Sequence, residues 1–192
     1  TLFGRNTTGG AVLFEPAKPK DQFEGSAQLQ IGNFNDREFE GMINVPIVSD
    51  KLMLRVAGRY ASRDGFTRDV KTGYDMDNRN YWTGRASLMF RPTETVENYL
   101  VVSTLKVDQH GTGSVIVGFN SGINPANGAL QGSVARRYGL PLLAQVLAEQ
   151  QARGPRLVDL NIVPSEQQRM TMVTDQLSIQ LGDHFKLRNI AS

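Results

Sequence analysis

The chain has 192 residues, of which 40% are hydrophobic and 21% charged, and its formal net charge is only +2. This near balance, with basic residues scattered along the chain, gives no sign of a nucleic-acid partner, and the lack of cysteine excludes disulfide scaffolds and thiolate metal sites. No stretch approaches the roughly 18 continuous apolar residues of a membrane-spanning helix.

Residues 1–20 are rich in glycine and proline. Gly4, Gly9 and Gly10 permit tight backbone turns, residues 11–14 read as a short strand, and the prolines that follow mark a linker. The chain starts without an initiator methionine and stops inside a strand-like run. We therefore expect it to be a fragment of a longer protein.

From residue 23 onward, apolar and polar residues alternate strictly. In residues 23–32 the odd positions are apolar or glycine, and the even positions up to Gln30 are polar. Successive side chains of a strand point to opposite faces, so one face is apolar and the other polar. The same pattern predicts further strands over 38–47, 52–61, 81–90, 99–107 and 173–181, with a seventh from Phe185. Counted from residues 23–32, the fifth strand, 99–107, shows the least regular alternation.

The connections alternate between short and long. Tight turns are expected at 33–36, 49–51, 93–96 and 182–184, and long loops at 64–80 and 108–169. In an up-and-down meander both long loops emerge at one end, as in outer-membrane barrels. The second loop should contain a helix that starts near Pro141 and stops at Gly154, with a helical turn at 131–138 before it. That helix either caps the barrel mouth or packs on its own loop.

The aromatic residues of the apolar face lie near the predicted strand ends and bracket an aliphatic band. Two aromatic girdles of this kind indicate a lipid-facing surface, whereas a soluble sandwich would favour aromatics at mid-strand. The predicted interface aromatics are Phe23, Phe39, Tyr60, Trp82, Phe90 and Tyr99.

The opposite face is charged and cannot be a dry core, which fits a hydrated lumen or one packed against a polar plug. If the second and third strands pair around residues 49–51, Glu40 should face Arg59 and form an ion pair. The charged wall comprises Glu38, Glu40, Arg55, Arg59, Arg63 and Arg85. The predicted fold is all-β: an antiparallel up-and-down transmembrane β-barrel fragment of about seven strands, with a short helical insertion in one long extracellular loop.

The first twelve residues, TLFGRNTTGGAV, resemble the end of the plug domain of TonB-dependent outer-membrane receptors. Residues 23–78 resemble the opening barrel hairpins of that family, and residues 185–192 resemble a later strand. The resemblance implies that residues 1–20 end a plug domain and that residues 21–192 begin a barrel of about 22 strands. The plug-end motif is carried by Gly4, Arg5, Asn6, Gly9 and Gly10.

The same resemblance implies a function. Members of this family import scarce ligands across the bacterial outer membrane, most often a ferric siderophore and sometimes a saccharide, cobalamin or haem. Their partners are outer-membrane lipid and the TonB complex, which engages a segment near the N-terminus that this chain lacks. A passive porin, an outer-membrane hydrolase and a soluble all-β binding module are the alternatives. We expect no enzymatic activity and no cofactor.

Little in the sequence points to chemistry beyond transport. The histidines, His110 and His184, have no neighbours at ligand spacing, so no metal site is expected. The acidic run at 75–78 has the composition of a turn more than of a cation site. Arg68, Lys71 and Tyr74 lie in the first long loop, which either faces a ligand or is simply solvated.

Overall fold

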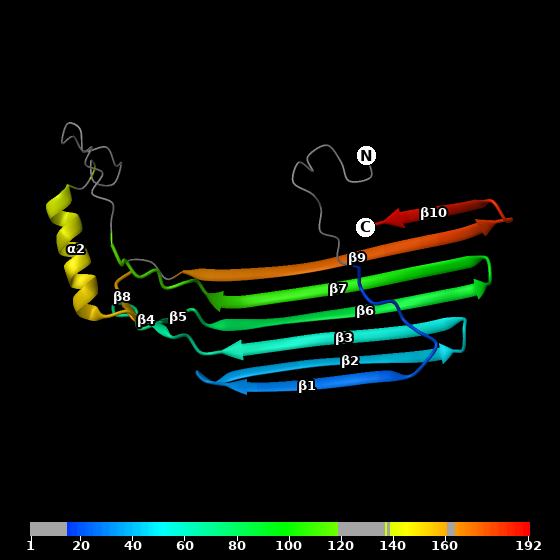
Figure 1. Cartoon of the computed structure of the whole chain (residues 1–192), viewed down its shortest axis with the longest axis horizontal. Helices are drawn as coiled ribbons and strands as arrows, with labels where there is room; N and C mark the ends of the chain where they lie inside the picture. Colours follow the sequence, from blue (N-terminus) through cyan, green and yellow to red (C-terminus); the bar gives the residue numbers. More distant parts are fainter. Residues whose placement is uncertain (1–14, 119–136, 138, 161–163) are drawn as a thin grey trace.

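The structure is a computed structural model that describes residues 15–118, 137, 139–160 and 164–192. Its main element is an antiparallel sheet of seven strands in the order β1-β2-β3-β6-β7-β9-β10 (Figure 1). The prediction of an all-β meander of about seven strands is confirmed, and the sheet is open, with β1 and β10 as its edges. The strands are β1 (Glu24–Gly32), β2 (Asp36–Val48), β3 (Leu52–Arg63), β6 (Arg79–Thr93), β7 (Val96–His110), β9 (Ser165–Leu181) and β10 (Phe185–Ala191).

Tight turns join β1 to β2, β2 to β3, β6 to β7 and β9 to β10, as the sequence predicts. Phe34 and Asn35 adopt φ of 60° and 56° between β1 and β2, and Asp50 adopts φ of 59° between β2 and β3. Gly182, which needs no side chain to fit a left-handed conformation, adopts φ of 64° between β9 and β10. The strands are longer than predicted, because β7 runs to His110 and β9 starts at Ser165.

The two long connections meet in a second, small sheet. This sheet has the order β5-β4-β8 and consists of β4 (Thr67–Asp69), β5 (Asp75–Met76) and β8 (Leu157–Val158). Because β4 and β8 pair across the two connections, the loops form one unit, which we call the loop cap. Strands of two or three residues are too short to show alternation, and the sequence analysis missed them.

A helix lies in the second connection, as predicted. α2 (Leu140–Arg153) begins with a proline in its first turn and ends at Gly154, whose φ is 90°. The predicted helical turn at 131–138 falls almost entirely outside the described residues.

The register gives the sheet two distinct faces. Side chains of directly opposed residues point the same way, so Phe39, Tyr60 and Trp82 share one face with the aliphatic row Ile43, Val56, Ala86, Val102 and Val173. We call this the apolar face. Its polar members include Asn98 and Asp175, which are hydrogen-bonded at 2.8 Å, and the threonines Thr104 and Thr171. The opposite side, which carries Glu38, Glu40, Arg55, Arg59, Arg63 and Arg85, is the charged face.

The prediction for the face of Tyr99 was wrong. Tyr99 is opposite Met89, and Val101 is opposite Ser87, so both side chains lie on the charged face. The fifth predicted strand is apolar on both sides, and alternation alone did not identify which side is which. Leu100 and Val102 take the predicted place on the apolar face.

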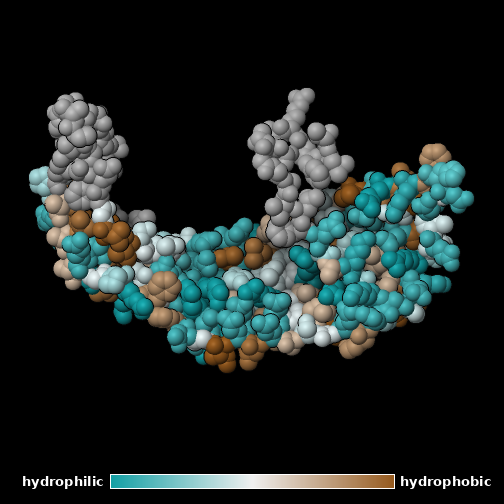
Figure 2. All heavy atoms as spheres, viewed as in Figure 1, coloured by the Kyte–Doolittle hydropathy of each residue, from teal (hydrophilic) through white to brown (hydrophobic). Residues whose placement is uncertain are grey.

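The buried hydrophobic cluster lies on the charged face, near the short-turn end. Met53, Met89, Tyr99 and Val101 form it. The linker before β1 passes across this face (Figure 1), where the Lys18 ammonium lies 5.3 Å from the centre of the Tyr99 ring. The linker therefore lies against the buried cluster, and the surface seen from this side is largely hydrophilic (Figure 2).

Candidate functional site

A network of ion pairs occupies the charged face toward the loop cap. Glu38 accepts from Arg59, and Arg79 contacts both Asp36 at 2.6 Å and Glu38 at 3.3 Å. The Glu38 side chain is only 11% exposed, so it is neutralised largely by the two guanidinium groups. These residues come from β2, β3 and β6, so their ion pairs link three adjacent strands of the sheet.

The predicted opposition of Glu40 and Arg59 is confirmed in register but not as an ion pair. The two residues face each other across β2 and β3. The Arg59 side chain instead reaches diagonally to Glu38, and among the described residues Glu40 forms no ion pair. The sequence indicates which residues face each other across two strands. It does not indicate that Glu38, two residues before Glu40 on the same face, is the carboxylate that accepts from Arg59.

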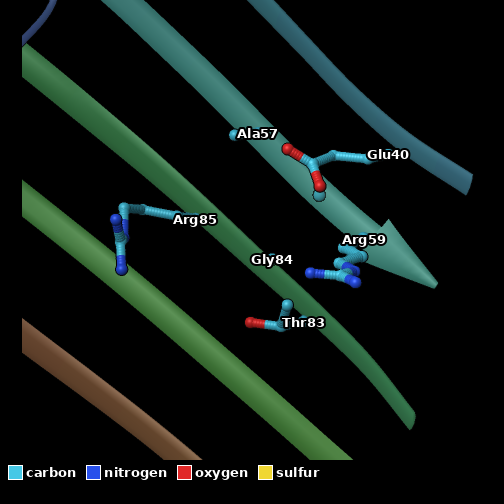
Figure 3. A pocket seen from close by; sticks show the side chains of 7 residues that line it. Glu40, Ala57, Arg59, Thr83, Gly84 and Arg85 are labelled. Carbon is cyan, nitrogen blue, oxygen red and sulfur yellow. The ribbon is translucent and has the colours of Figure 1, made fainter. Parts of the chain in front are cut away.

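The unpaired Glu40 lies at a hollow of about 220 Å³ in the charged face. Figure 3 shows Glu40, Arg59, Thr83 and Arg85 around this hollow, on three neighbouring strands. The Arg85 Nε donates to the Ser103 hydroxyl at 3.2 Å, which leaves most of its guanidinium open. The site offers charged and hydroxyl groups to a polar occupant, and it contains no nucleophile with a neighbouring base.

The different surroundings of Glu38 and Glu40 give a matched test. In Glu38→Gln, Arg59 loses its carboxylate partner and Arg79 keeps only Asp36, so we expect the free energy of unfolding to fall by about 1–2 kcal/mol, a figure reduced for solvent screening. Glu40→Gln should change it by less than about 0.5 kcal/mol. Urea titration of both variants measures the difference, and equal losses would contradict the assigned network.

The linker is fixed to the charged face by a buried asparagine. The Asn44 side chain is 0% exposed and accepts from Lys20 N–H at 3.0 Å. It also donates to the carbonyl oxygens of Lys20 at 2.8 Å and Gln22 at 2.6 Å. Two outer contacts support this clasp: Ser49 with Asp21 at 2.7 Å, and Lys18 with Glu97 at 3.2 Å.

The loop cap contains the residues that the sequence predicts to face a ligand. Lys71 pairs with Asp159 at 2.7 Å, and Tyr74 packs edge-on against His110 with ring centres 5.1 Å apart. Arg68 is exposed, and its backbone N–H donates to the Arg156 carbonyl. Lys71 therefore helps to join the two connections, Tyr74 contacts the last residue of β7, and Arg68 presents a side chain to solvent.

Asp69 is the buried centre of the loop cap. Its carboxylate accepts from the Leu160 N–H at 2.9 Å, from the Thr72 hydroxyl and from the Thr72 N–H at 3.0 Å. These hydrogen bonds, first of all the one from Leu160, lower the pKa of Asp69 from 3.8 to about 2. Since the folded-state pKa lies below the ordinary one, Asp69 stabilises the cap above pH 4, and this stabilisation is lost as the pH falls toward 2.

We therefore expect the loop cap to open on acidification between about pH 4 and pH 2. Hydrogen exchange at the Leu160 amide should accelerate in this range beyond the intrinsic pH dependence. Asp69→Asn should exchange faster at neutral pH and lose the acid step. Asp183→Asn, in the turn at the other end of β9, is the matched control and should keep it. An unchanged acid step in Asp69→Asn would contradict the assignment.

The remaining predicted site residues divide by location. Gly4, Arg5, Asn6, Gly9 and Gly10 lie outside the described residues. Arg55 pairs with Glu24 at 3.2 Å, and Arg63 donates to the Asp77 carbonyl at 2.6 Å. Phe23, Phe39, Tyr60, Trp82 and Phe90 are exposed.

Sequence reasoning missed Asp36, Arg79 and Asn44. Extending the second and fourth predicted strands toward the loop end would have placed Asp36 and Arg79 close together. Asn44 carries no such signal, since it is one more polar residue on a polar face.

Within the described residues, no group of three or more histidine, aspartate or glutamate side chains is placed to hold a metal ion. Among the same residues, no helix has the length and hydropathy to cross a membrane. No protein-family model matches the chain, and the comparison with solved structures finds no match.

Proposed function

We propose that this chain is part of a TonB-dependent transporter of the bacterial outer membrane, which imports a scarce ligand of the ferric siderophore class. In this proposal the sheet is a segment of the barrel wall, with the apolar face toward lipid and the charged face toward the lumen. The loop cap then lies on the extracellular side, and the protein catalyses no reaction.

The observation that carries the proposal is the exposure of the whole apolar face. Phe39, Tyr60 and Trp82 form one row across three strands and are 51%, 46% and 43% exposed. Soluble monomers rarely expose contiguous apolar patches beyond a few hundred Å², and this face extends over the sheet. A hydrocarbon solvent would remove the cost of that exposure.

The height of the band also fits a bilayer. Trp82 and Phe90 are both exposed on β6, and their separation along the strand is about 27 Å. At a strand tilt of about 40° this corresponds to roughly 21 Å along the membrane normal, close to the apolar band of an outer-membrane barrel, about 25 Å tall.

The linker favours a plugged transporter over a passive porin. It runs from residue 15 across the charged face to β1, held by Asn44 and Glu97. Its first described residues, Glu15 and Pro16, lie beside Arg85 and Tyr99 on the charged face. In the proposed barrel this is the lumen, where a plug domain would be located.

Spin labels on β6 test the orientation of the sheet. These 192 residues contain no cysteine, so single cysteines can be placed at positions 83, 85, 86, 88 and 90 once any cysteine elsewhere in the complete protein has been replaced. In the complete protein in vesicles, labels at 86, 88 and 90 should be accessible to oxygen, and labels at 83 and 85, beside the hollow of the charged face, to a water-soluble nickel complex. Labels at 86 and 88 that neither reagent reaches would indicate a sealed protein core and reject the proposal.

Transport is tested in cells. Deleting the gene should abolish uptake of one radiolabelled ferric siderophore, and uptake by the wild type should stop when the proton gradient of the inner membrane is dissipated. Uptake that survives this treatment and scales with solute size would support the passive porin instead.

A further inference from the structure

The row of aromatic residues on the apolar face continues into two cations. Trp82 is directly opposite Lys106, and Lys106 is directly opposite Arg169. The full row across five strands is therefore Phe39, Tyr60, Trp82, Lys106 and Arg169. Both cations lie at the level of the aromatic girdle, on the side of the sheet with the exposed aliphatic residues.

Neither cation has a counter-ion in the described part of the chain, where the ion pairs involve other residues. The nearby Asp108 carboxylate accepts from Gln167 at 3.3 Å. Two like charges directly opposite each other destabilise a sheet, and a charge next to hydrocarbon is costly without a partner. An anion supplied from outside would remove both costs.

The surface between the two cations has room for such an anion. The strand segments that carry the two cations border a hollow of about 450 Å³, which is lined by Lys106, Val107, Asp108, Gln167, Gln168 and Arg169. One row closer to the centre of the band, the side chains are the hydroxyl-bearing Thr104 and Thr171, and the next row is Val102 and Val173. The three rows are therefore basic, hydroxyl-bearing and aliphatic. In the same order, a lipid has a phosphate group, ester groups and acyl chains.

We infer that Lys106 and Arg169 bind the phosphate group of an anionic lipid in the membrane leaflet at the loop-cap end. The lipid's acyl chains lie along Val102 and Val173, and its phosphate occupies the hollow beside Trp82. This inference rests on the proposed function, since it requires the apolar face to contact lipid. It identifies one specific lipid partner of that face.

Trp82 is the only tryptophan of the chain and is next to Lys106, so its fluorescence reports on the site. The complete outer-membrane protein, with tryptophans outside this segment replaced by phenylalanine, is reconstituted into vesicles. The vesicles mix phosphatidylcholine and phosphatidylglycerol, with bromine on the acyl chains of one lipid at a time. Quenching of Trp82 against lipid ratio gives the relative affinity of the two lipids at this position.

We expect phosphatidylglycerol to be favoured about fivefold or more, since each basic residue near the membrane surface contributes roughly a factor of five. The double variant Lys106→Gln, Arg169→Gln should reduce the preference to about one. Lys186→Gln with Arg188→Gln removes the same charge from the opposite face of β10 and should leave the preference unchanged.

The outcomes separate the two proposals. Equal quenching by both lipids in the wild type would overturn the lipid site and leave the lipid-facing orientation intact. Absence of quenching by either lipid would overturn the orientation and the lipid site together. A preference that persists in the Lys106 and Arg169 double variant would also overturn the inference.

Discussion

Ile43→Arg is expected to prevent stable insertion of the sheet, whereas Met42→Arg, one residue earlier, is expected to be tolerated. Ile43 lies in the central aliphatic row of the apolar face, and Met42 points to the charged face between Glu40 and Asn44. An arginine at the middle of a lipid-facing barrel surface costs about 2–4 kcal/mol. On the charged face it meets water and nearby carboxylates, so we expect a change of less than about 1 kcal/mol.

Urea-dependent folding of the complete protein into phosphatidylcholine vesicles measures both variants. The two positions share a strand, a neighbourhood and nearly the same depth, so only the direction of the side chain distinguishes them. If the apolar face were exposed to water, Ile43→Arg would fold as well as the wild type and gain solubility. That result would reject the orientation on which the transporter proposal depends.

Asn44→Leu is expected to release the linker from the sheet. The substitution removes three hydrogen bonds to the linker backbone and leaves the Lys20 N–H and the Lys20 and Gln22 carbonyls without that partner. Unsatisfied buried groups cost about 1–3 kcal/mol each, and some regain water when the linker lifts, so the net loss should be about 2–3 kcal/mol. The amide of Lys20 should then exchange about 30- to 150-fold faster.

Asn189→Leu is the matched control for this clasp. Asn189 is exposed on β10, and its side chain forms no hydrogen bond within the described residues. Its substitution should change the exchange of the Lys20 amide by less than twofold. If Asn44→Leu left this amide equally protected, the linker would be held by Lys18 and Asp21, and Asn44 would be a structural residue of β2 alone.

In the proposed transporter, loss of the Asn44 clasp should also affect how tightly the barrel is closed to ions. The linker joins the sheet to whatever precedes residue 15, and in the proposed transporter that is the plug. Weakening the clasp should allow this segment to move relative to the wall. Small-ion leakage through the Asn44→Leu protein in planar bilayers is then expected to exceed that of the wild type.

Much of the main sheet could be predicted from the sequence, for a local reason. Side-chain direction in a strand repeats every two residues, so residues such as Leu29, Val56 and Leu88 show their face without any knowledge of their neighbours. Turn residues such as Asp50 and Gly182 are likewise predictable, because their residue types favour the left-handed backbone conformation that they adopt. These properties are determined within a few consecutive residues.

Where both sides of a strand are apolar, this local information is insufficient. Tyr99 and Leu100 compete for the apolar face in the sequence, and only the pairing of β7 with β6 decides between them. The choice of Glu38 over Glu40 as partner of Arg59 depends on the positions of side chains from three strands at once.

The sequence alone determined the alternating strands, the turns between them, the helix after Pro141 and the presence of one apolar and one charged side. Tertiary structure decided the face of β7, the joining of two distant loops through β4 and β8, and the clasp of the linker by Asn44. The physical reason is the distance along the chain over which each property is determined. Backbone conformation and side-chain direction follow from neighbouring residues, whereas register, charge pairing and burial depend on residues that only the folded chain brings together.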